Sequence, residues 1–223
     1  MRTPQFAARL PMSTPHLLNI VLHVLAGSVA MAIGVYQLAN AKGSDAHRRW
    51  GRGFCYAGLV VCLSAALGLA AFRFLPNFAA LTVLVLYQLL GGWRSARTRE
   101  RGPQAADAAL TLAAVAAGAW LAPIVLAAGA NMLVYSSLGA LASVVAYDAA
   151  RWLFPRRWFA RLWRYEHSYK LIAALFGMVS ALVGNVVRFG QPWSQLLPLA
   201  LGFATVGFVF VRLYRQDAAR RRG

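Results

Sequence analysis

Apolar residues run along this chain in seven long stretches separated by short polar segments. A helix needs roughly 20 mostly apolar residues to cross a bilayer, and each stretch is close to that length. The pattern therefore predicts an all-α fold, a polytopic transmembrane bundle of about seven spans. The boundary between the fourth and fifth spans has Gly129 as its only clear break. The predicted spans are 16–38, 53–70, 78–93 (short), 105–126, 131–149, 167–187 and 193–213.

These spans predict a single transmembrane domain over residues 16–214, with an N-terminal tail at 1–15 and a basic tail at 215–223. The N-terminal apolar run is too long for a signal peptide and has no clear small-residue cleavage site. Segment 155–165 combines aromatic residues with arginines, which predicts an amphipathic helix lying on the membrane surface. Its apolar face would consist of Trp158, Phe159, Leu162 and Trp163.

The composition supports a membrane protein and excludes two other classes. Hydrophobic residues make up 60% of the chain and charged residues 13%, whereas a globular domain has about 25% charged residues. A disordered chain would have low hydrophobicity. An ordinary soluble domain could not bury this much apolar surface.

The basic residues are distributed unequally between the two sides of the predicted membrane. Of the 23 lysines and arginines, 19 fall on the side that holds the C-terminus and 4 on the other. Because basic residues in short loops stay in the cytoplasm, we expect the N-terminus outside and the C-terminus inside a bacterial inner membrane. The net charge of +17 is spread over separate segments at the span ends. This distribution predicts contact with anionic lipid headgroups rather than with nucleic acid.

Several polar residues are expected on the cytoplasmic side of the spans, where they form a candidate site. His47 and His167 are predicted at similar depth, and imidazoles at such positions can bind haem b or a metal ion. His23 lies inside the first span and is a further candidate ligand. The alternative is that the histidines only form hydrogen bonds to neighbouring helices or headgroups. The rest of the predicted polar pocket consists of Asp148, Glu166 and Arg52.

Part of the chain resembles a family of bacterial membrane proteins, domain of unknown function 2306. The resemblance rests on His23 and Gly27 in the first span, on the segment 47–52 (His-Arg-Arg-Trp-Gly-Arg), and on Glu166-His167 at the start of the sixth. It implies a multi-pass membrane protein in which His23, His47 and His167 are the positions of interest. It implies no activity.

The sequence leaves the function open among three hypotheses. One is a redox or metal-binding membrane protein that uses the histidines. The second is a non-enzymatic carrier of a small molecule or ion. The third is an assembly partner that docks through segment 155–165. Motifs for nucleotide binding, zinc hydrolysis and serine catalysis are absent from the sequence, and the sequence indicates neither a substrate nor an oligomeric state.

Overall fold

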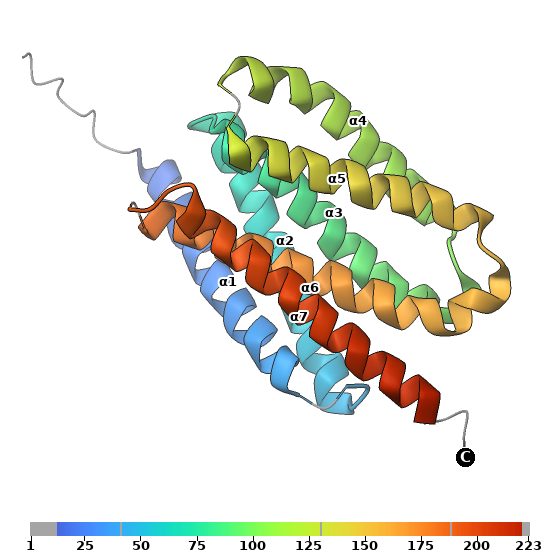
Figure 1. The fold of residues 1–223 in the computed structure, drawn as a ribbon. Helices are drawn as coiled ribbons and strands as arrows, with labels where there is room; N and C mark the ends of the chain where they lie inside the picture. The colour runs from blue at the N-terminus through green and yellow to red at the C-terminus, as the bar shows by residue number, and fades with distance from the viewer. Residues whose placement is uncertain (1–12, 41, 130, 188, 220–223) are drawn as a thin grey trace, which may run out of the picture.

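The computed structural model describes residues 13–40, 42–129, 131–187 and 189–219. Each predicted span corresponds to one long helix of this structure (Figure 1). Six of the long helices are long and apolar enough to cross a membrane, so the chain is a multi-pass membrane protein. The long helices are α1 Thr14–Ala39, α2 Asp45–Ala71, α3 Pro76–Thr98, α4 Ala105–Ala127, α5 Met132–Ala150, α6 Phe159–Val186 and α7 Trp193–Ala219.

Successive helices run antiparallel, so the chain connections alternate between the two ends of the bundle (Figure 1). One end gathers the connections 40–44, 99–104 and 151–158 together with the C-terminus of α7. We call it the basic end, because these connections and the helix ends that adjoin them hold most of the lysines and arginines of the chain. Three short 3-10 helices lie at this end: η1 Arg99–Arg101, η2 Arg151–Leu153 and η3 Arg156–Trp158.

Local signals explain where several helices begin and end. Ser44 caps α2, since its hydroxyl accepts a hydrogen bond from the backbone N–H of His47 at 3.0 Å. The Asn131 side chain caps α5 in the same way. Gly129 adopts a φ of 103° between α4 and α5, a conformation that favours glycine. The predicted break at this residue is therefore confirmed.

Helix α3 lies at the centre of the fold and differs in character from the others. It packs against α2, α4, α5 and α6, and it is the one long helix of the described chain that is not apolar enough to count as a span by itself. Its buried residues include Gln88 and Ser95. Because neighbouring helices rather than lipid surround it, α3 can carry polar side chains that a lipid-facing helix could not.

The interface between α3 and α6 is close because two consecutive glycines face α6. A Cβ atom on Gly92 would lie 2.8 Å from a methyl carbon of Leu171 and 3.0 Å from the Cβ of Lys170. A Cβ on Gly91 would lie 3.3 Å from the ammonium nitrogen of Lys170. Small residues of this kind allow helix backbones to approach in membranes. Here they let the long side chain of Lys170 lie between α3 and α6.

The expected amphipathic helix at 155–165 is not a separate element. Residues 156–158 form η3, and α6 then runs without interruption from Phe159 to Val186. Phe159, expected on a lipid-facing surface, is 3% exposed and packs against the turn at Gly102, where an added Cβ would lie 2.8 Å from its ring. The turn at Gly102 covers the Phe159 ring, and the spacing of apolar residues in the sequence could not predict this contact. Similarly, α7 extends into the predicted tail as far as Ala219.

Candidate functional site

Six charged residues near the basic end form one connected network, which we call the charge cluster. They come from α3, α4, α5, η2 and α6, and three are basic and three acidic: Arg94, Asp107, Asp148, Arg151, Glu166 and Lys170. The side chains of Asp148, Arg151, Glu166 and Lys170 are all at most 5% exposed. Burying charges is tolerated only when they are paired and hydrogen-bonded, and the balance of signs meets this requirement.

Lys170 and Asp148 form the deepest pair of the charge cluster. The ammonium nitrogen of Lys170 donates to both carboxylate oxygens of Asp148, at 2.6 and 2.7 Å. The hydroxyl of Tyr87 donates to the same carboxylate at 2.5 Å and lies 3.0 Å from the hydroxyl of Thr111. Since Tyr87 is seven residues from Arg94, the cluster extends about 10 Å along α3. The pair thus joins α5 to α6, and Tyr87 ties α3 to both.

Arg151 lies among all three acidic residues of the charge cluster. Its guanidinium is 2.8 Å from Glu166 and 3.6 Å from both Asp148 and Asp107. Its Nε atom is buried and has no hydrogen-bond partner among the described residues. Asp107 receives two further hydrogen bonds from Arg94, at 2.7 and 3.1 Å. One arginine therefore holds the ends of α4, α5 and α6 together.

Glu166 completes the network with two neutral partners. The hydroxyl of Tyr147 donates to one of its carboxylate oxygens at 2.8 Å, and the hydroxyl of Ser95 lies 3.3 Å from the other. Aromatic rings also surround the ammonium group of Lys170, with the ring centres of Tyr87 and Tyr169 at 6.0 and 5.8 Å. Each of the two deepest carboxylates thus accepts a hydrogen bond from one tyrosine hydroxyl in addition to its ion pair.

Two of the predicted histidines are neighbours. The ring centres of His47 and His167 are 6.4 Å apart, with the ring planes at 85°. The Nδ1 atom of His167 is 3.0 Å from the carbonyl oxygen of Gly92. The Nδ1 atom of His47 is buried without a hydrogen-bond partner among the described residues. The pair offers two imidazoles between α2 and α6.

His23 does not join this pair. Its Nδ1 atom is 2.9 Å from the hydroxyl of Ser64 on α2, and the side chain of Asn19 donates to the Ser64 carbonyl. Ser64 and His47 are 17 residues apart on the same helix, which separates them by about 25 Å. His23, the further candidate ligand, therefore lies far from the other two histidines. Because α1 and α2 run antiparallel, His23 packs against the end of α2 that is far from His47.

The predicted polar pocket is also composed differently. Asp148 and Glu166 do share a site, but their partners are Arg151, Lys170 and tyrosines rather than histidines. Arg52 is exposed on α2. Lys170 was not predicted as a site residue, although an ionisable residue four positions after Glu166 and inside an apolar stretch is a usable signal.

Metal coordination receives no further support from the surroundings of the histidines. In the described part of the chain, no group of three or more His, Cys, Asp or Glu side chains is placed to hold a metal ion. Of the three predicted histidine ligands, His47 and His167 are the two whose rings lie close together.

Comparisons with known proteins give no assignment for this chain. No protein-family model matches it, and neither a curated protein nor a solved structure matches it. The resemblance to domain of unknown function 2306 therefore stays a prediction.

Proposed function

We propose that the protein is a carrier of the bacterial inner membrane that couples the movement of a small solute to protons through its charge cluster, with the basic end in the cytoplasm. The observation that carries the proposal is the buried pair of Lys170 and Asp148. Ionisable residues inside membrane helices are costly, and they commonly mark proton relays and substrate paths.

The pair also offers a physical route from protonation to movement. A proton on Asp148 removes its negative charge and leaves the ammonium group of Lys170 buried without its counter-ion. That state is unfavourable unless the helices move or another anion arrives. Because Asp148 is on α5 and Lys170 on α6, separation of the pair changes how these helices pack. A charged solute that replaces either partner would have the same effect.

The proposal can be tested in proteoliposomes that contain a pH-sensitive dye. A panel of amino acids, organic acids and organic cations is added outside, and solute-dependent proton movement is recorded. The variant removes both charges, Asp148→Asn with Lys170→Met, because replacing a buried pair by neutral groups is often tolerated by the fold. The matched control is Asp45→Asn, which removes an exposed carboxylate at the same end.

We expect at least one solute to drive proton movement in the natural protein and in the control, and none to do so in the double variant. The double variant should still fold, which a single symmetrical elution peak and a cooperative melting transition in detergent verify. Absence of any response from the natural protein, or the same response from the folded double variant, would refute the proposal.

A second candidate function rests on the neighbouring imidazoles of His47 and His167. If the Gly92 carbonyl accepts the Nδ1 proton of His167, the Nε2 atom of that ring is left free for a metal or haem iron. The test is an absorption spectrum with elemental analysis of detergent-purified protein. A Soret band or a stoichiometric metal that His167→Ala abolishes supports this function, and finding neither in the natural protein removes it.

A further inference from the structure

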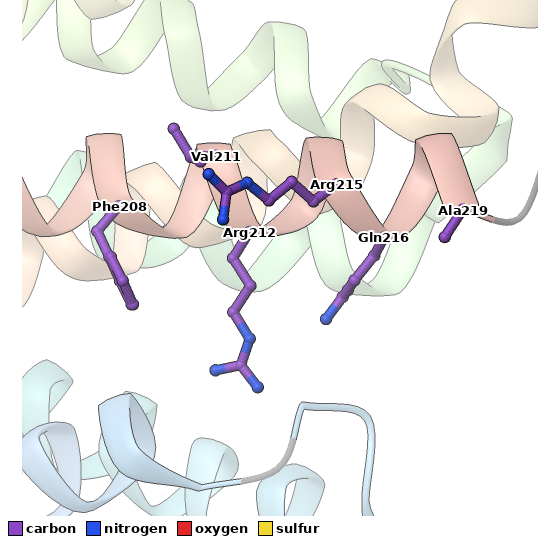
Figure 2. Close-up of a pocket in the computed structure, with 6 residues that line it drawn as sticks. All are labelled: Phe208, Val211, Arg212, Arg215, Gln216 and Ala219. Carbon is purple, nitrogen blue, oxygen red and sulfur yellow. The ribbon is translucent and has the colours of Figure 1, made fainter.

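A groove lies along the C-terminal third of α7, outside the charge cluster. It has a volume of about 400 Å³, and the residues that line it recur at helical spacing on one face of α7 (Figure 2). Two of them are arginines and none is acidic. We call this surface the α7 groove, and its lining residues are Phe208, Val211, Arg212, Arg215, Gln216 and Ala219.

Part of the α7 groove, with Phe208, Arg212 and Gln216, lies on the side of α7 that faces the hairpin of α1 and α2 (Figure 2). Helices α7 and α1 each pack against α6, but within the described residues they make no extensive contact with each other. Figure 2 shows the Arg212 side chain extending from α7 toward the α1–α2 hairpin. Lys42 lies in that hairpin, where its ammonium group donates to the carbonyl oxygens of Gln37 and Leu38. Partial burial and the positive charge of Arg212 lower the pKa of Lys42.

The nearest acidic residues of the neighbouring elements are already paired. Asp217 on α7 accepts from Arg164 and Tyr165 of α6. Asp45 on α2 is paired with Arg48. Arg212 is thus near enough to Lys42 for their positive charges to repel, and the acidic residues Asp217 and Asp45 are each paired with another cation. Two such charges favour an anion between them.

The same face of α7 becomes apolar away from the basic end. Phe208 is 68% exposed, and Leu201, two turns earlier, is 52% exposed. About 16 Å of helix separates Leu201 from Arg212. The surface thus combines two cations at one end with exposed apolar side chains running toward the membrane centre. A phospholipid has this distribution of charge and hydrocarbon, whereas a free phosphate would use only the basic part.

We propose that the α7 groove binds one anionic phospholipid, with its phosphate between Arg212 and Lys42 and an acyl chain along Phe208 and Leu201. The charge complementarity commits the site to an anionic rather than a zwitterionic lipid. This inference does not depend on the proposed transport function. It assigns a lipid to the α7 groove in particular rather than to the basic end as a whole.

The test is native mass spectrometry of the full chain released from nanodiscs that contain equal amounts of phosphatidylglycerol and phosphatidylcholine. We expect one retained phosphatidylglycerol in the natural protein. Arg212→Gln should lower this retention about fivefold, the effect of losing one basic residue near a headgroup. The control Arg161→Gln removes an exposed arginine at the same end, outside the groove, and should leave retention unchanged.

Four outcomes would overturn the inference. Equal loss in Arg212→Gln and Arg161→Gln would show a diffuse charge effect. Equal retention of phosphatidylcholine and phosphatidylglycerol, or displacement of the lipid by soluble glycerophosphoglycerol, would contradict an anionic site that also holds an acyl chain. A dimer that Arg212→Gln dissociates would assign the groove to a second copy of the chain. Both variants change exposed residues, and a melting curve in detergent verifies that they fold.

Discussion

Removing the charge of Asp148 should destabilise the protein more than removing its partner. In Asp148→Asn, the ammonium group of Lys170 stays buried at 1% exposure and loses its paired negative charge, keeping one amide oxygen and the nearby tyrosine rings. Breaking a buried pair by deleting one partner costs about 3–5 kcal/mol. In Lys170→Met, the Asp148 carboxylate keeps the Tyr87 hydroxyl at 2.5 Å and the Arg151 guanidinium at 3.6 Å. Its cost should therefore be smaller, about 1–3 kcal/mol.

The double variant separates the pair energy from the effects of packing. With both charges absent, no buried charge lacks a partner at this position, and the loss should be well below the sum of the two single losses. A coupling energy of about 2–3 kcal/mol is expected for groups in direct contact. The assay is equilibrium unfolding in mixed micelles, with Asp45→Asn as a control expected within about 0.5 kcal/mol of the natural protein. Additive single losses, or Lys170→Met as the more damaging change, would refute this account of the cluster.

Three further predictions concern packing, the isolated histidine and orientation. Gly92→Ala should lower the free energy of unfolding by about 1–3 kcal/mol, because its Cβ would meet Leu171. Gly139→Ala should not lower it in the same micelle titration, because its Cβ would have no neighbour within 4 Å. His23→Ala should lower the free energy of unfolding by about 0.5–1.5 kcal/mol, because one hydrogen bond is lost. It should leave any solute-driven proton flux unchanged. Loss of this flux in folded His23→Ala protein would place His23 in the transport path. A fluorescent protein fused to the C-terminus should fluoresce and an alkaline phosphatase fusion should be inactive; active phosphatase there would reverse the predicted orientation.

Hydrophobic patterning predicted the helices because a segment needs a certain length and apolar content to cross a bilayer by itself, and even the less apolar α3 has a recognisable apolar stretch. It also located Asp148 and Glu166 at one end of the bundle. It could not identify their partners. Lys170 was counted among the charges at the membrane surface, and only the close approach of α6 to Gly91 and Gly92 places it inside the protein.

The histidines also show that a single sequence predicts depth in the membrane better than it predicts neighbours. His47 and His167 were expected at similar depth, and the structure brings their rings together. His23 is also a histidine that belongs to the family resemblance, yet it lies beside Ser64, far along α2 from His47. Depth follows from position within a span, but the choice of neighbouring helix depends on packing that a single sequence does not display.

The enclosure of α3 by its neighbours has a consequence for how the chain is made. A segment leaving the translocon enters lipid readily only if it is sufficiently hydrophobic, and α3 is the least suited of the long described helices to do so alone. We therefore expect α3 to stay next to the translocon, or packed against α2, until α4 to α6 have been synthesised. Correct insertion of the centre of the protein would then be a late, cooperative event, and truncation of the chain after α3 should leave that helix exposed to quality-control proteases.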